Sequence, residues 1–259
     1  MKTMRSKILA YIILPLGATV YGTHLGLNHL EKKYPNRPLT TGSKLLQTPN
    51  NTQTQHCPYT DIYSARIPLQ ALVARRNTNS KSPDKNALED AWAHSLLGSP
   101  LLKTEASIFG LLSRGTYEPG DLGNTEAGFK PDATGKPRKL MNGIMEVQRQ
   151  SGVDDDSNGL LISWKMADEP RLFFERIAKW GYPWRLMSGG RHEMSVSEPF
   201  EIEGRRFVEV RFASAHDYEV VQAEGLEQKI LPEWTNRLHR GFARLVLDFA
   251  VRELEKSCD

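Results

Sequence analysis

The chain ends in a long amphipathic stretch, PEWTNRLHRGFARLVLDFAVREL, at residues 232–254. Pro232 suits the first turn of a helix because proline lacks the N–H that this turn leaves unbonded. Large apolar residues then recur every three or four positions opposite a charged side, which is the period of an amphipathic helix. The apolar side is Trp234, Leu238, Phe242, Leu245 and Phe249, and the charged side is Arg237, Arg240, Arg244 and Asp248. We predict one long terminal helix that packs through its aromatic side.

Ahead of this helix, several segments alternate between apolar and polar residues, which is typical of strands with one buried side. Two of them flank a turn at Glu203-Gly204, and two others flank residues 154–159, which end in Asn-Gly and predict a hairpin. The predicted strands cover residues 61–69, 140–150, 160–166, 191–201 and 205–221.

Helices are predicted between these strands. Leu88, Trp92 and Leu96 recur every four residues and share one side, and Pro100 begins a second helix directly afterwards. Asp168 is a good N-cap for a later, shorter helix. Residues 117–139 are rich in glycine and proline and predict a long irregular loop, a feature that often carries function.

This order of elements, completed by the terminal helix Pro232–Leu254, resembles the SRPBCC (START-like, polyketide-cyclase-like) superfamily over residues 61–254. The insertion at residues 169–187 departs from the simplest family pattern. The resemblance implies an α+β, helix-grip-like fold, in which a curved antiparallel sheet wraps around the last helix and leaves a cavity. It also implies a hydrophobic small-molecule ligand, because some relatives are cyclases, dehydratases or pericyclases. The overall texture resembles filamentous-fungal proteins found among secondary-metabolism genes.

The N-terminus differs from the rest of the chain. Lys2, Arg5 and Lys7 precede an uncharged run over residues 8–27, which is long enough to span a bilayer as a helix. The run also suits a cleaved signal peptide, and a disordered or partly helical tail is a third interpretation. The basic flank favours a single-pass endomembrane anchor with a lumenal domain, the alternative being secretion after cleavage. The predicted organisation is an anchor or signal at residues 1–33, a polar linker at 34–58 and one domain at 59–256.

Composition and motifs exclude several classes of function. The net charge of +3 is spread over interspersed basic and acidic residues, which argues against a nucleic-acid partner. Cys57 and Cys258 are the only cysteines, so they are free thiols or form one bridge between distant positions. The chain has no Walker loop, no Rossmann fingerprint and no nucleophile elbow. We therefore expect no nucleotide cofactor and no serine-hydrolase chemistry.

Two stretches, Arg-His-Glu and His-Asp-Tyr, place ionisable groups beside apolar strand sequence. Strand alternation puts His192 on an apolar side and puts His216 on the same side as Val208, so both imidazoles face one interior. Neutral imidazoles there can act as general base and acid near neutral pH. Glu193 and Asp217 are the predicted partners that orient them. The alternative is that the histidines are hydrogen-bonded core residues and the carboxylates are solvated.

Arginines and aromatic residues complete the predicted site. Arg191 or Arg211 would stabilise a developing oxyanion, or each would instead pair with a nearby acid. Stacking on aromatic side chains can hold a polycyclic substrate in an apolar cavity, or the same side chains form ordinary core. The candidate ligand-binding residues are Trp164, Trp180, Trp184 and Tyr218.

Metal sites are disfavoured. The two histidines and two carboxylates lack the tight spacing that zinc or iron sites show. Asp154, Asp156 and Asn158 match the opening of a calcium loop, but Lys165 stands where the bidentate glutamate should be. We interpret this segment as a charged hairpin turn.

These observations lead to one functional hypothesis and one alternative. The hypothesis is a small-molecule biosynthetic enzyme that acts on a polyketide- or terpenoid-like substrate in an internal cavity, without a cofactor, by cyclisation, isomerisation or dehydration. The alternative is a non-catalytic, membrane-associated carrier of a lipid or metabolite.

Overall fold

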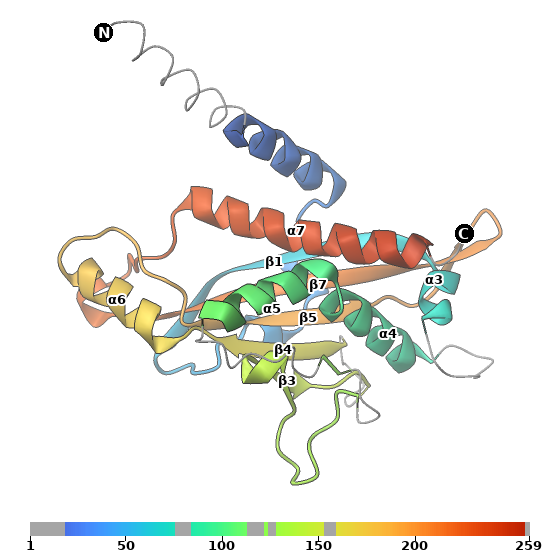
Figure 1. The fold of residues 1–259 in the computed structure, drawn as a ribbon, viewed down its shortest axis with the longest axis horizontal. Helices are drawn as coiled ribbons and strands as arrows, with labels where there is room; N and C mark the ends of the chain where they lie inside the picture. Colours follow the sequence, from blue (N-terminus) through green and yellow to red (C-terminus); the bar gives the residue numbers. More distant parts are fainter. Residues whose placement is uncertain (1–18, 76–83, 113–121, 124–127, 153–158, 257–259) are drawn as a thin grey trace, which may run out of the picture.

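The computed structural model describes residues 19–75, 84–112, 122–123, 128–152 and 159–256. They form an α+β fold in which a curved antiparallel sheet of seven strands carries most of its helices on one side (Figure 1). The strand order is β1-β7-β5-β4-β3-β2, and the short β6 pairs with β7. The strands are β1 (Gln55–Pro68), β2 (Lys139–Leu140), β3 (Met145–Arg149), β4 (Leu160–Lys165), β5 (Gly189–Val196), β6 (Phe200–Ile202) and β7 (Arg205–Glu219).

The helices follow the predicted order, with short additions. A helix over residues 19–33 precedes the domain. The other helices are α2 (Lys44–Gln47), α3 (Leu69–Ala74), α4 (Lys85–Leu97), α5 (Pro100–Leu112), α6 (Asp168–Lys179) and α7 (Glu233–Lys256). Single 3-10 turns lie at η1 (Leu39–Thr41), η2 (Met141–Gly143) and η3 (Gln222–Glu224).

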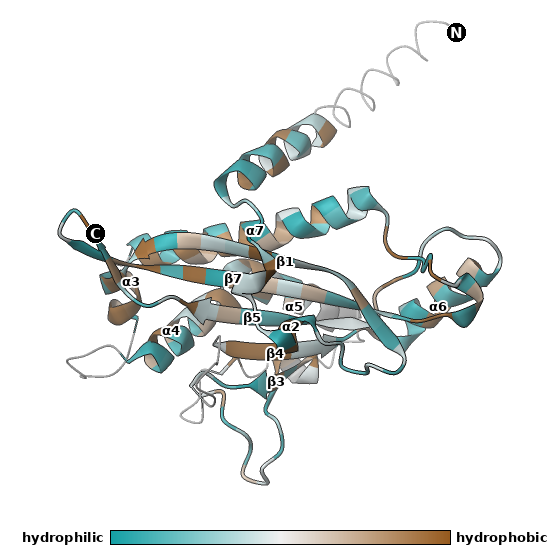
Figure 2. Cartoon of the chain, turned by 180° about the vertical axis from the view of Figure 1, so that it is seen from behind, coloured by the Kyte–Doolittle hydropathy of each residue, from teal (hydrophilic) through white to brown (hydrophobic). Residues whose placement is uncertain are grey.

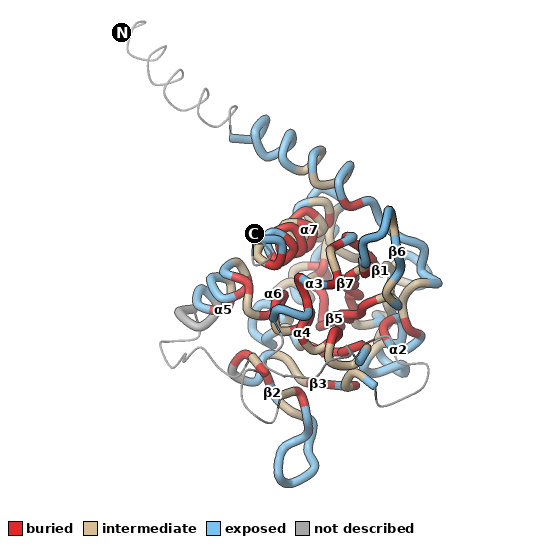
Figure 3. The backbone as a smooth tube through the Cα atoms, turned by 90° about the vertical axis from the view of Figure 1, so that its right-hand side faces the viewer, coloured by how far each residue is buried: buried red, intermediate tan, exposed pale blue. Residues whose placement is uncertain are grey.

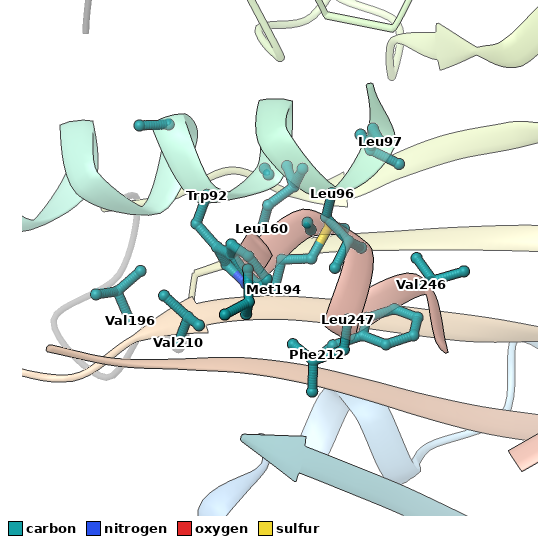
Figure 4. Close-up of a cluster of buried hydrophobic side chains, with 14 of the residues drawn as sticks. Trp92, Leu96, Leu97, Leu160, Met194, Val196, Val210, Phe212, Val246 and Leu247 are labelled. Atoms are coloured by element: carbon teal, nitrogen blue, oxygen red, sulfur yellow. The ribbon is translucent and has the colours of Figure 1, made fainter. Parts of the chain in front are cut away.

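One face of the sheet packs against α4 and α7, and we call it the helical face. Buried apolar side chains cover the part of this face that contacts α4 and α7 (Figure 4). Met194 of β5 and Val210 and Phe212 of β7 lie in one buried cluster with Trp92 of α4 and Leu247 of α7. Full burial of each large side chain contributes about 1.5–3 kcal/mol, so this cluster is the main stabilising contact between the sheet and its helices.

The buried side of α7 differs from the predicted one. Trp234 is 59% exposed, Leu238 is 42% exposed and Phe249 is 39% exposed. The residues that α7 buries against its neighbours include the small Ala243 and Ala250. Val246, Leu247 and Leu254 are buried beside them, and of the predicted residues Phe242 packs partly buried against the core. The buried side of α7 is therefore rotated from the predicted one and overlaps it only in part.

The helix at residues 19–33 packs against another side of α7. The second half of the helix at residues 19–33 lies on α7, while its first half projects into solvent (Figure 3). Glu31 pairs with Arg237 at 2.8 Å, and a Cβ on Gly241 would come within 2.0 Å of a terminal methyl of Leu27, so a larger residue there would force the Leu27 side chain to move. Within the described part of the chain, no helix is long and apolar enough to cross a membrane.

Residues 34–58, predicted to be a polar linker, belong to the folded domain. The buried Tyr34 donates a hydrogen bond to Asp248 of α7 at 2.8 Å. Residues 39–50, which we call the N-terminal strap, cross the face of the sheet opposite to the helical face, where α2 lies over β5 (Figure 2). The first strand then begins at Gln55 rather than at Asp61. The linker prediction was wrong because two short buried segments do not produce a periodic apolar pattern.

Leu46 anchors the strap. Its side chain is fully buried in a small cluster on this second face, together with Ile62, Leu161, Ala213 and Ala215. The approach is close, because a Cβ on Gly42 would lie 3.0 Å from the side chains of both Ile62 and Leu46.

We predict that Leu46→Ala destabilises the protein by about 2–5 kcal/mol, because it removes buried methyl groups and leaves a cavity. Leu45 is the matched control, since it is the adjacent residue in α2 and is 51% exposed. Leu45→Ala should change the free energy of unfolding by no more than about 0.5 kcal/mol. Urea denaturation of both variants measures the difference. Equal effects of the two substitutions would contradict the role of the strap.

Candidate functional site

The pairing of β5 with β7 places several polar residues on the helical face. His192 lies opposite Ser214 and Gly190 lies opposite His216, and His216 in turn lies opposite Tyr59 of β1. Directly paired residues of an antiparallel sheet point to the same side. Both predicted histidines therefore share the helical face, as the alternation indicated.

A third histidine, His239 of α7, completes what we call the histidine cluster. The Nε2 atoms of His216 and His239 lie 2.8 Å apart and form a hydrogen bond in which one ring donates and the other accepts. The hydroxyl of Ser214 lies 3.3 Å from the same Nε2 of His216. His239 lies one helical turn before Ala243, which the structure shows to be buried, so the two residues share one side of α7. The prediction missed it by choosing the aromatic side of the helix.

Aromatic rings enclose this cluster. The Trp164 ring centroid lies 6.3 Å from that of His192 and 6.2 Å from that of His216. The Tyr59 ring lies 5.2 Å from His216 on the other side. Gly190 makes room for the indole, because a Cβ there would lie 3.0 Å from two atoms of the Trp164 ring and 2.3 Å from a backbone oxygen.

Several polar atoms on this face are buried without a hydrogen-bond partner in the described structure, among them Oδ2 of Asp61 and the Tyr63 hydroxyl, and three of them are nitrogens of the cluster and of the ring beside it. These nitrogens are Nδ1 of His192, Nδ1 of His216 and Nε1 of Trp164. A buried polar group left unpaired costs about 1–3 kcal/mol, so native proteins rarely gather several in one place. The cluster has unused hydrogen-bonding capacity that a bound molecule could satisfy.

Burial keeps the three imidazoles neutral. Burial, and to a smaller extent the nearby His239, lowers the pKa of His192 to about 3. The pKa of His216 falls well below its usual value, mainly through burial and then through the neighbouring His239 and His192. Burial and the nearby Arg240 also lower the pKa of His239. All three rings are therefore available near neutral pH as proton acceptors or as neutral donors.

Asp61 brings a carboxyl group to the same face. It lies opposite Ser214 in the pairing of β1 with β7 and is buried. Burial raises its pKa, and the positive charges of Arg240 and Arg244 oppose that rise. Sequence patterns do not single out Asp61, because it stands at the start of the predicted first strand without a neighbouring motif.

Tyr218, a predicted ligand-binding residue, borders the cluster and holds α7 in place. Its hydroxyl lies 3.2 Å from that of Tyr59, which donates to Asn236 of α7 at 2.8 Å. The backbone N–H of Leu231 donates to the Tyr218 hydroxyl at 3.4 Å. These bonds join β1 and β7 to the beginning of α7 beside the histidines.

The predicted carboxylate partners of the histidines lie on the opposite face of the sheet. Asp217 forms a bidentate ion pair with Arg191 at 2.6 and 2.7 Å, beneath the N-terminal strap. Glu193 accepts hydrogen bonds from Arg149 at 2.9 Å and from the Ser43 side chain. Because successive strand residues point to opposite faces, a carboxylate directly next to a histidine in sequence cannot orient that histidine.

The same alternation places the two arginines predicted to stabilise an oxyanion on the face opposite to the histidine cluster. Arg191 also donates through Nε to the carbonyl of Leu46 in the strap at 2.7 Å, so all three of its guanidinium nitrogens are hydrogen-bonded on this face. Arg211 lies on the same face and pairs with Glu209 at 2.8 Å. Its contribution to the helical face is only a backbone carbonyl, which accepts a hydrogen bond from Trp92 at 2.8 Å.

The predicted aromatic wall is divided between two places. Trp164 lies in the histidine cluster, but Trp180 is 79% exposed at the end of α6. Trp184 contacts Trp234 at the start of α7, with ring centroids 6.0 Å apart. These two tryptophans belong to a separate surface.

The remaining candidates give no metal site. No group of three or more histidine, cysteine, aspartate or glutamate side chains in the described ranges is arranged to hold a metal ion. Asp154, Asp156 and Asn158 lie outside the described residues, as does Cys258. Cys57 is a partly buried free thiol close to the carbonyl of Tyr59.

Comparisons of the chain with models of known protein families, with curated proteins and with solved structures find no match. The chemistry of the helical face therefore has to carry the functional interpretation.

We predict that the histidine cluster makes the protein sensitive to acid. A histidine whose pKa is lower in the folded than in the unfolded state stabilises the protein above pH 6.5, and this contribution is lost as the pH falls toward the folded pKa. Between pH 6.5 and about 3, His192 should lower the free energy of unfolding by up to about 1.4 kcal/mol per pH unit. Urea denaturation across this range compares the wild type with His192→Phe, which should show a shallower slope. Parallel slopes would contradict the buried, neutral state of His192.

Proposed function

We propose that the chain is a helix-grip protein that binds a hydrophobic small molecule between its sheet and α7, and that it catalyses a proton transfer there. The strand order β1-β7-β5-β4-β3-β2 and the long final helix packed on one face support the helix-grip assignment. The partial exposure of Trp164, His192 and His239 on this otherwise buried face supports a space beside them.

The observation that carries the proposal is the bond between His216 and His239 next to an unpartnered Nδ1 of His216. A neutral imidazole carries one N–H. When His216 donates its Nε2 proton to His239, its Nδ1 is a bare proton acceptor. When His239 donates instead, the Nδ1 of His216 carries the proton. When Nδ1 of His216 takes up a substrate proton, the Nε2 proton of His216 can pass to His239, which becomes the imidazolium while His216 stays neutral with its proton on Nδ1. The reverse transfer returns the proton and restores Nδ1 as a base.

This relay suits reactions that both remove and return a proton. Nδ1 of His216 would take a proton from a carbon next to a carbonyl, and the substrate would become an enol or enolate. Trp164 Nε1–H, buried without a partner, would donate a hydrogen bond to the substrate oxygen. Returning the proton at another atom gives isomerisation, attack by the enol carbon gives cyclisation, and loss of a hydroxyl gives dehydration.

A non-catalytic carrier is the second candidate, and one observation favours it. In the described structure, no carboxylate hydrogen-bonds to the histidine cluster, so nothing like a catalytic triad orients the rings. The unpartnered nitrogens would then only bind polar atoms of a cargo molecule.

Deuterium exchange tests the enzyme proposal without requiring the final reaction. A panel of polycyclic aromatic and isoprenoid ketones is incubated with the protein in D₂O, and mass spectrometry follows deuterium uptake beside the carbonyl. We expect the wild type to accelerate uptake into some members of the panel. His216→Phe and His239→Phe should reduce this acceleration by about 10²–10⁴-fold, the usual contribution of a positioned acid or base.

His29→Phe is the matched control, because His29 is an exposed histidine on the helix at residues 19–33. It should leave exchange unchanged, and circular dichroism verifies the folding of all three variants. Ketones that bind without faster exchange would identify a carrier instead. Exchange that survives both cluster substitutions would remove the histidine pair from the mechanism.

A further inference from the structure

The exposed face of α6 carries large apolar side chains with no covering element in the described structure. Trp180 is 79% exposed, Phe173 is 55% exposed and Leu172 is 47% exposed. Their spacing in sequence places these three residues on one side of α6, which lies at one end of the molecule (Figure 2). Three large apolar side chains grouped on one short helix mark an interaction surface rather than scattered surface residues.

Two basic residues stand among these apolar side chains. Arg176 follows Leu172 by one helical turn and precedes Trp180 by one turn, so it lies in the middle of the same stripe. Lys179 lies beside it in the last turn. Both are exposed, and neither has an ion-pair or hydrogen-bond partner in the described part of the chain.

The rest of α6 is different, because its charges are neutralised within the helix. Arg171 pairs with Asp168 at 2.8 Å and with Glu175 at 2.6 Å. The acid on the exposed face is Glu169, which lies in the first turn, away from Trp180. Unpaired positive charge is therefore concentrated among the apolar side chains in the second half of the helix.

A neighbouring loop extends this surface and holds it in position. Leu226 is completely exposed on the loop that follows η3. The loop is fixed to α6 by Lys229, which donates to the carbonyl of Ala178 at 2.8 Å, and to the domain by the pair Arg185–Glu224 at 3.0 Å. We call Leu172, Phe173, Arg176, Lys179, Trp180 and Leu226 the α6 surface.

We propose that the α6 surface docks the protein on a lipid bilayer. Aromatic and aliphatic side chains around unpaired cations match the layered chemistry of a membrane interface, where acyl chains lie beneath phosphate groups. Tryptophan is suited to this depth because its ring is apolar and its N–H can remain hydrated. The surface is distinct from the histidine cluster, so the docking can be correct even if the proposed catalysis is wrong.

A second copy of the chain is a poorer occupant. In a two-fold symmetric contact the same surface faces itself, so Arg176 and Lys179 of each copy would outnumber the one acid on the exposed face of α6, Glu169. Phosphate groups of a membrane neutralise these charges.

Tryptophan quenching by brominated lipids tests the proposal on the full chain. All five tryptophans lie at or after Trp92, so the uncharged N-terminal run contributes no signal even if it enters the bilayer. Vesicles of brominated phosphatidylcholine, with and without phosphatidylserine, should quench the emission of the wild type. Trp180→Phe keeps the surface apolar and should remove most of that quenching, while Trp164→Phe should not.

Vesicle sedimentation then measures the contribution of each part. Replacing Arg176 and Lys179 by glutamine should weaken binding to phosphatidylserine vesicles about fivefold for each charge. Phe173→Ser should weaken binding to both kinds of vesicle, whereas Ile108→Ser, an equally exposed apolar residue on α5, should have no effect. Binding without quenching would attribute membrane attachment to another segment and overturn the proposal. An absence of binding, or a concentration-dependent change of tryptophan emission without vesicles, would overturn it as well.

Discussion

The antiparallel pairing of β5 with β7 is the constraint on which the rest of the structure depends. Its register places His192 beside Ser214 and Gly190 beside His216, and the two-residue repeat sends every neighbouring side chain through to the other face. The helical face thus carries the neutral imidazole rings. The opposite face carries Arg191 with its partner Asp217, and Glu193 with its partner Arg149. A shift of one residue would exchange the two sets and bury unpaired charges beneath α7. The chemistry of the site and the attachment of the strap are therefore two consequences of a single register.

The buried ion pair beneath the strap is a structural element, because both members are enclosed and fully bonded. Arg191 uses Nε for the carbonyl of Leu46 and both terminal nitrogens for Asp217. A buried pair seldom adds much to stability compared with apolar residues, but loss of one partner leaves an uncompensated charge. Its geometry requires the strap at one position on the sheet, which explains why residues that look like a linker are ordered there.

Much of the fold could be predicted, because the strands alternate and α5 and α7 begin at or directly after a proline. The predicted N-cap Asp168 is instead the first residue of α6, whose N-cap is Ala167. The site could be predicted only in part. Alternation correctly grouped His192 with His216, and the same rule should have separated them from Glu193 and Asp217. His239 was missed since α7 has two packed sides, one on the sheet and one on the helix at residues 19–33. An amphipathic pattern identifies only one buried side of a helix. It favours the side with the largest apolar residues, although Ala243 and Ala250 are buried in α7 while Trp234 is exposed.

The unpartnered nitrogens of the helical face are what distinguish this site from ordinary core. An apolar residue at His192 or His216 would pack in the same space without leaving a polar atom unpaired, and the strands would accept it. Stability alone therefore gives no reason for three imidazoles and an indole N–H at one place. A ligand that hydrogen-bonds to these atoms would compensate their burial and would bind more tightly for it.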